Sequence, residues 1–271
     1  MFVRDLYETW RSSHRTAVRK RWKSIVWAYA MTWTVGLLVV IPFFLAYVLL
    51  GRLRVRGYRK LVLALVRGKV IIASNHPAVL ESLFISILCC PFFLCAASLF
   101  WPYAMPDAKT FLPKRHWWVY RWIRCITVDR GDKEHVVLGT KTAVRHLRNG
   151  YTLVIHPEGG RTFKLPQGER YHFHHDRRLR PLKDGVASLA LMGGTEVGIL
   201  PLWVQFHGPT IERPESTWSL LKRGLVIYVG DLYSPEQEST GASRTALKVA
   251  ITQDLARRIL RAGLESDTTL T

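Results

Sequence analysis

An uncharged stretch near the N-terminus limits what this chain can fold into. Residues 25–50 form a run of 26 residues without a charged side chain. As a straight helix the run would be about 39 Å long, which exceeds the roughly 30 Å hydrocarbon core of a bilayer. It is too long and begins too late for a signal peptide. The sequence therefore predicts a membrane-embedded helical segment over 25–50, either a tilted spanning helix kinked at Pro42 or a re-entrant helical hairpin. A buried core helix of a soluble domain is the less favoured alternative.

The flanks of this stretch and the net charge both favour contact with an anionic surface. Residues 1–24 form a basic segment, Arg52, Arg54 and Arg56 follow the stretch, and the chain carries a formal net charge of +19. This charge indicates a polyanionic neighbour, either nucleic acid or an anionic membrane. The ten Trp residues favour the membrane, because Trp collects at bilayer interfaces. We expect membrane lipids as partners and no nucleic acid, since no nucleic-acid-binding module is recognisable. Basic flanks on both sides give no clear orientation.

Beyond residue 60, short apolar runs alternate with helical patterns, which is typical of an α/β domain. We expect this domain to occupy residues 51–271, with a mixed β-sheet flanked by helices. Strands are predicted at residues 70–73, 126–128, 152–155, 197–204 and 225–229. Helices are predicted at residues 77–90, 134–148, 185–192 and 243–262. Residues 208–223 are predicted to form a loop.

The segment from Asn75 to Glu81 carries the first candidate site. Proline disfavours helical geometry in the residue before it and is welcome at the first helical position. We therefore expect His76 to end a strand-to-helix turn and the helix to begin at Pro77, with Glu81 in its first turn. A carboxylate on one ring nitrogen fixes the tautomer and leaves the other nitrogen as a general base. The pattern predicts a catalytic pair of His76 and Glu81, with a purely structural histidine as the alternative.

Two further strand ends carry groups suited to an anion. The segment 156–162, His-Pro-Glu-Gly-Gly-Arg-Thr, follows an apolar strand, and its glycines let the backbone approach a ligand. Arg161 offers a bidentate partner for phosphate, although an ordinary turn with a solvated Arg is the alternative. Arg130 follows a second strand end. Because ligands in open α/β sheets gather at the carboxyl ends of strands, we expect these groups to share one pocket.

Together these motifs resemble the glycerolipid acyltransferase superfamily, in particular the PlsC-type 1-acylglycerol-3-phosphate acyltransferases of bacteria. The family motif N-H-x4-D is matched by 75–81 with Glu at the acidic position. A hydrophobic-Asp-Arg strand end is matched by 128–130. F-P-E-G-T-R-S is matched by 156–162, with His for Phe, Gly for Thr and Thr for Ser. A proline within an apolar strand is matched by Pro201, and a Lys-x-Gly that opens a helix is matched by 183–185.

The resemblance implies an O-acyltransferase that moves a fatty acyl group from acyl-CoA or acyl-carrier protein to a hydroxyl of a lysophospholipid. The expected acceptor is 1-acylglycerol-3-phosphate, which would give phosphatidate. The resemblance implies catalysis by His76 and Glu81. It implies a substrate-binding set of Arg130, Glu158, Gly159, Gly160, Arg161 and Lys183. No metal and no cofactor besides the acyl donor are expected.

The resemblance also implies an inner or plasma membrane location, with the active site facing the cytoplasm. Two alternatives remain: another lipid acceptor, such as a lyso-ornithine lipid or a saccharolipid, and a catalytically silent scaffold that binds anionic lipid.

Three features depart from the family pattern. Glu81 is one methylene longer than the usual Asp, which keeps the charge but shifts the geometry. Residues 163–182 have the character of an insertion rich in His and Arg. We expect it to be a basic loop that touches headgroups or a carrier protein, with a metal site as the less favoured alternative. His156 adds an imidazole near the site, and the sequence suggests no specific role for it.

Overall fold

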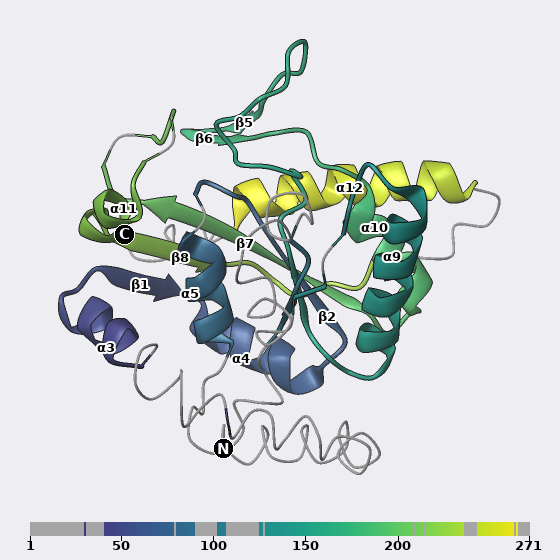
Figure 1. Cartoon of the computed structure of the whole chain (residues 1–271), viewed down its shortest axis with the longest axis horizontal. Coiled ribbons are helices and arrows are strands. Elements are labelled where there is room, and N and C mark those ends of the chain that lie inside the picture. Colours follow the sequence, from purple (N-terminus) through teal and green to yellow (C-terminus); the bar gives the residue numbers. More distant parts are fainter. Residues whose placement is uncertain are drawn as a thin grey trace.

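The computed structural model describes residues 30, 41–78, 80–89, 102–106, 125–126, 128–208, 210–213, 215–235, 243–262 and 264. In chain order its elements are α3 (Ile41–Leu49), β1 (Leu53–Arg56), α4 (Tyr58–Arg67), β2 (Val70–Ser74), α5 (Leu80–Leu88), β3 (Tyr103–Ala104), α9 (Lys133–Arg148), β4 (Leu153–Ile155), β5 (His172–His174), β6 (Arg177–Leu179), α10 (Gly185–Gly193), β7 (Gly198–Phe206), α11 (Thr217–Arg223), β8 (Leu225–Val229) and α12 (Arg244–Arg261). Figure 1 shows their arrangement in space.

A mixed β-sheet forms the centre of the fold. Its six strands are ordered β1-β8-β7-β2-β4-β3. β7 and β8 are antiparallel, whereas the other neighbouring strands are parallel. β5 and β6 form a separate antiparallel hairpin, which lies at the top of the molecule in Figure 1. The predicted mixed sheet flanked by helices is confirmed in the part of the chain that is described.

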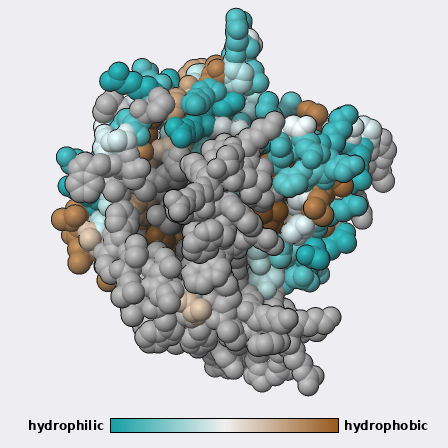
Figure 2. Space-filling view, in the orientation of Figure 1, coloured by the Kyte–Doolittle hydropathy of each residue, from teal (hydrophilic) through white to brown (hydrophobic). Residues whose placement is uncertain are grey.

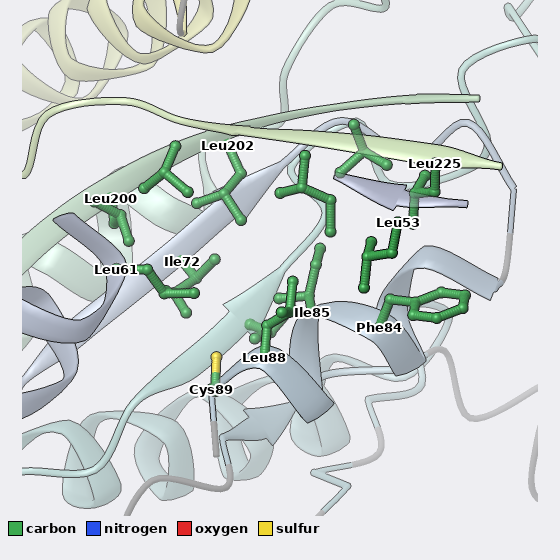
Figure 3. Close-up of a cluster of buried hydrophobic side chains, with 14 of the residues drawn as sticks. Leu53, Leu61, Ile72, Phe84, Ile85, Leu88, Cys89, Leu200, Leu202 and Leu225 are labelled. Atoms are coloured by element: carbon green, nitrogen blue, oxygen red, sulfur yellow. The ribbon is translucent and has the colours of Figure 1, made fainter. Parts of the chain in front are cut away.

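Helices cover both faces of the sheet. Alternate residues of β2 face opposite sides, as in any strand. Ile72 packs in a cluster that includes Phe84 of α5 (Figure 3). Ile71 packs in a second cluster with Leu147 of α9 and Ile259 of α12. Burial on both faces explains why β2 is continuously apolar, as is typical of strands in a parallel arrangement.

Most of the predicted elements are confirmed, with ends shifted by a few residues. The strands expected at 70–73, 152–155, 197–204 and 225–229 are β2, β4, β7 and β8, and the helices expected at 134–148, 185–192 and 243–262 are α9, α10 and α12. Side-chain caps fix two of the helix starts. Asp132 accepts hydrogen bonds from the backbone N–H groups of Glu134 and His135, and Ser243 accepts one from Ala246.

Other predictions were wrong in detail. At 126–128, expected as a strand, the described residues form isolated bridges instead, at Cys125, which pairs with Ala104, and at Val128. The backbone N–H groups of Ile126 and Val128 donate to the carbonyls of Ala104 and Pro106, and Thr127 lies outside the described residues. Residues 208–223, expected as a loop, contain α11, whose cap Ser216 accepts a hydrogen bond from the Ser219 backbone. The α/β pattern also begins before residue 60, with β1 and α4.

The predicted membrane segment lies mostly outside the described residues. Of residues 25–50, the structure describes Ala30 and residues 41–50. The latter form α3, a helix of nine residues, and a turn. Among the described residues, no helix combines the length and the apolar character needed to cross a bilayer. The segment over 25–50 therefore stays a prediction.

Candidate active site

The candidate site lies where two neighbouring parallel strands end. β2 ends at Ser74 and β4 ends at Ile155, so the residues that follow them meet at the same edge of the sheet. The buried side chain of Asn75 fixes the end of β2. Its Oδ1 accepts a hydrogen bond from the Val204 backbone N–H at 2.7 Å, and its Nδ2 donates to the Val204 carbonyl at 2.9 Å. The amide thus takes the place of a further β2 residue beside β7.

The backbone of His76 is held by the segment that follows β4. Its N–H donates to Glu158 Oε1 at 2.7 Å, and its carbonyl accepts from the Thr162 N–H at 2.8 Å. Because both groups are engaged across the site, His76 stays outside the helix, as the sequence predicted. The helix itself begins at Leu80 and not at Pro77, which corrects the predicted start. Glu81 still lies in its first turn.

His76 and Glu81 contact each other directly. His76 Nδ1 makes a short hydrogen bond with Glu81 Oε1. An ionised carboxylate can only accept, so Nδ1 carries the proton and Nε2 keeps a free lone pair. Glu81 is fully buried, and 19% of the His76 side chain is exposed. Burial opposes ionisation of Glu81, but the hydrogen bond and the electrostatic attraction of the neighbouring His76 outweigh it and hold the pKa of Glu81 below its usual value.

A second imidazole lies flat against the first. The rings of His156 and His76 are stacked with centroids 4.2 Å apart and planes 12° apart. His156 Nδ1 lies 3.2 Å from the Asn75 carbonyl and 3.3 Å from the Ser74 carbonyl. Its Nε2 lies 2.8 Å from Ser82 Oγ on α5. Burial, together with the neighbouring His76, lowers the pKa of His156 to about 4, so the ring is neutral at pH 7.

These side chains also form the one group among the described residues with three possible metal ligands, whose ligand atoms lie within 4.8 Å of one another. Histidine binds a metal through a lone pair in the plane of its ring, at about 2.0–2.1 Å for zinc. Two nearly parallel stacked rings do not direct their lone pairs at a common point. As arranged, His76, Glu81 and His156 are therefore suited to hydrogen bonding and proton transfer. No residue of the His-rich segment 163–182 belongs to this group.

Glu158 supports the site from within. Its Oε1 accepts hydrogen bonds from the His76 N–H and from Thr162 Oγ1, and its Oε2 accepts from the Arg180 N–H at 3.1 Å. The side chain is fully buried, and burial raises the pKa of its carboxyl. Its oxygens thus accept from two backbone N–H groups and the Thr162 hydroxyl, so Glu158 shapes the segment after β4.

Two glycines let cationic side chains approach the same segment. Gly159 has a φ of +69°, and a Cβ there would lie 3.0 Å from Arg130 Nη1 and 3.4 Å from Lys183 Cγ. Arg130 Nη1 donates to the Gly159 carbonyl at 2.5 Å. A Cβ on Gly160 would lie only 2.7 Å from Arg180 Nη1. The sequence resemblance suggested a role for each glycine but did not indicate that Arg180 fills the space beside Gly160.

The predicted anion ligands lie around this segment, with different degrees of exposure. Arg130 and Lys183 are both exposed, and Lys183 lies 3.5 Å from Glu169. Arg161 is half-buried and lies over the ring of Phe163 at 5.9 Å. Exposed cations at the carboxyl edge of a sheet are suited to a phosphate group.

The insertion at 163–182 is not simply a basic surface loop. Arg177 is buried, and its Nη1 donates to the carbonyls of Leu260 and Ala262 at 2.8 Å each. Its guanidinium also lies over the ring of Tyr228 at 4.8 Å. Arg177 is therefore held in a buried position by the end of α12 and by an aromatic ring on the sheet. The hairpin still exposes Phe173.

A family model for acyltransferases matches residues 52–205, more than half of the 271-residue chain. The chain belongs to the acyltransferase family. The match runs from β1 into β7, so it includes both strand ends that carry the site. One solved structure similar to this acyltransferase is the 1-acyl-sn-glycerophosphate (LPA) acyltransferase PlsC from Thermotoga maritima, with 16% sequence identity, a TM-score of 0.48, and coverage of 90% of this chain and 96% of that one. No curated protein matches this acyltransferase.

Proposed function

We propose that this acyltransferase transfers a fatty acyl group from acyl-CoA or acyl-carrier protein to the free hydroxyl of a lysophospholipid. The proposed acceptor is 1-acylglycerol-3-phosphate, and the product is phosphatidate. The observation that carries the proposal is the short contact between His76 Nδ1 and the buried carboxylate of Glu81. It leaves Nε2 as the proton-accepting atom of a partly exposed imidazole.

The proposed reaction proceeds by direct transfer. His76 Nε2 takes the proton of the acceptor hydroxyl while the oxygen attacks the carbonyl carbon of the thioester. The tetrahedral intermediate collapses, the carbon–sulfur bond breaks, and the leaving thiolate takes the proton from the imidazolium. Glu81 stabilises the transient positive charge on His76. The acyl donor is the only co-substrate, and the scheme uses no metal or further cofactor.

The cations around Gly159 support a phosphate-bearing acceptor. Arg130 and Lys183 lie close to the position that a Cβ on Gly159 would occupy. In the proposed complex they bind the acceptor phosphate together with Arg161. A guanidinium can bind two phosphate oxygens at once, whereas an ammonium contributes a compact charge. The three residues thus offer both kinds of contact.

We also propose that the chain acts at the inner or plasma membrane, with the site on the cytoplasmic side and residues 25–50 in contact with lipid. Part of the described α3 and the turn after it is apolar and exposed: Leu45 is 49% exposed, Leu49 84% and Leu50 64%. Figure 2 shows this hydrophobic patch at the left edge of the molecule. Arginines 52, 54 and 56 follow it directly. Exposed leucines next to cations suit an interface with anionic lipid.

An acceptor screen tests the proposed function. Purified protein is incubated with labelled acyl-CoA or acyl-carrier protein and with lysophosphatidate, lyso-ornithine lipid or a saccharolipid precursor, and products are identified by mass spectrometry. We expect phosphatidate, and a loss of about 10²–10⁴-fold in kcat for His76→Ala. The exposed His172→Ala is the matched control. Acylation of another acceptor but not of lysophosphatidate would refute the proposed substrate, and an active His76→Ala would refute the proposed base.

A further inference from the structure

His156 stands where the family motif has phenylalanine, and its contacts exceed those that phenylalanine can make. The ring lies flat on His76, a contact that any aromatic side chain provides. Its two ring nitrogens make additional polar contacts at the two ends of the segment that carries His76 and Glu81. One side is the end of β2, at the carbonyls of Ser74 and Asn75. The other side is the first turn of α5, at Ser82.

The hydrogen-bond partners fix the tautomer of His156. The carbonyls near Nδ1 can only accept, so Nδ1 carries the ring proton. In the neutral ring, Nε2 is then an acceptor and takes the hydrogen of the Ser82 hydroxyl. Burial favours this neutral form. A neutral ring places no second positive charge against His76 when His76 takes up a proton.

The two polar contacts enclose the residues that carry the proposed chemistry. Asn75 immediately precedes His76, and Ser82 immediately follows Glu81. Through them, His156 connects the end of β4 to both ends of the segment between β2 and α5. The stacked ring restrains the plane of the His76 imidazole, while the Ser82 contact restrains the helical turn that carries Glu81.

We propose that His156 is a positioning residue for the transfer reaction, which holds the His76 imidazole in the plane where Nδ1 meets Glu81 and Nε2 meets the acceptor hydroxyl. The inference rests on the proposed role of His76 as the base. It assigns the stack and the Ser82 hydrogen bond to one task, the orientation of the base. Misplacement of a reacting group by about 1 Å can cost about 100-fold in rate, so a contact that restrains the ring acts mainly on kcat.

The test is a double-mutant cycle on His156→Phe and Ser82→Ala. His156→Phe keeps a stacked ring but loses every polar contact of the imidazole. Ser82→Ala removes only the hydrogen bond between the Ser82 hydroxyl and His156 Nε2. We expect each single variant to lose about 10-fold in kcat. The KM for the acyl donor and the KM for the acceptor should stay within about twofold of wild type. The double variant should be no slower than either single variant, because both substitutions remove the same interaction. His156→Ala, which also removes the stack, is expected to be slower than His156→Phe.

Ser86→Ala is the matched control, because its hydroxyl donates to the Ser82 carbonyl within the same helix, whereas the Ser82 hydroxyl is the one that meets His156 Nε2. It is expected to keep the wild-type kcat. Circular dichroism and melting temperature establish that each variant is folded at the assay temperature. A wild-type kcat in His156→Phe, or losses that add fully in the double variant, would overturn the inference. Activity in His76→Ala would instead overturn the proposed base, so the two failures are distinguishable.

Discussion

Glu81 is fully buried, and the contact with His76 keeps it ionised despite that burial. Glutamine has nearly the same shape but carries no charge to stabilise the protonated His76. For Glu81→Gln we expect a loss of at least about 100-fold in kcat, with little change in the KM for the acceptor. Steady-state transfer from labelled acyl-CoA measures both. The control is Glu134→Gln, at an exposed position in the first turn of α9. A Glu81→Gln variant within a few-fold of the wild-type kcat would contradict the proposed pair.

The depressed pKa of His156 also links stability to pH. The folded-state pKa is about 4, whereas an unperturbed histidine titrates near 6.5. Between these values the unfolded chain binds a proton at His156 that the folded chain does not. The contribution of His156 to stability is therefore complete above about pH 6.5 and is lost as the pH falls through about 4. We expect the free energy of unfolding to fall less between pH 7 and pH 4 in His156→Phe than in the wild type.

Urea unfolding at several pH values in this window measures the effect. All other titratable groups are present in both proteins, so the difference between their slopes reports residue 156 together with its electrostatic coupling to His76 and Glu81. Equal slopes would contradict the low pKa.

Individual residues differed in how far the sequence could predict them. The pair of His76 and Glu81 was predictable because a proline and a five-residue spacing lie in one short segment. The contact of Asn75 with Val204 joins residues 129 positions apart and leaves no local signal. Arg180 lies in a run of histidines and arginines that is typical of a solvated loop, so its burial beside Gly160 could not be predicted.

At the scale of elements, the amide of Asn75 holds β2 against β7. Leucine has the same branched shape and number of heavy atoms but cannot hydrogen bond, so Asn75→Leu leaves the buried Val204 N–H and C=O without partners. Each such group costs about 1–3 kcal/mol, so we expect a loss of about 2–6 kcal/mol in the free energy of unfolding. Denaturant titration measures it, with the exposed Asn149→Leu as control. Equal stability of the two variants would contradict the structural role of Asn75.

Elements with a long or clean apolar period were predictable. In α12 the spacing of Leu247, Ile251, Leu255 and Ile259 indicated the buried side, and all four pack in the second core cluster. β1 was missed because its two apolar residues alternate with arginines directly after a long apolar run. The β5–β6 hairpin was missed because its strands have three residues each and are mostly polar.

At the scale of the whole molecule, the net charge of +19 and the exposed leucines of α3 suggest that two forces act at a lipid surface. We expect the full-length protein to bind vesicles of anionic phospholipid more strongly than vesicles of neutral phosphatidylcholine. The bound fraction on anionic vesicles should fall as salt rises, because screening shortens the Debye length from about 10 Å at 0.1 M to about 3 Å at 1 M. Co-sedimentation measures the bound fraction.

A charge-reversal pair indicates which part of the molecule meets the lipid. Arg54 in β1 and Lys141 in α9 are both exposed, and these elements lie at opposite sides of the view in Figure 1. Arg54→Glu should weaken binding to anionic vesicles more than Lys141→Glu. Equal effects would contradict a lipid-facing surface at α3 and β1.

The bonds of Arg177 to the end of α12 have a consequence for anyone who wishes to re-engineer this chain. Arg177 pairs with His174 next to the turn of the hairpin, so the His-rich insertion is anchored to the domain close to that turn and cannot simply be exchanged. Deleting the insertion would remove the Arg177 guanidinium from the carbonyls of Leu260 and Ala262 at the end of α12. It would also expose the ring of Tyr228 that the guanidinium covers. The exposed position of Phe173 is by contrast a suitable attachment point for a fluorophore or a cross-linker. Redesign can therefore alter position 173, provided that Arg177 is kept.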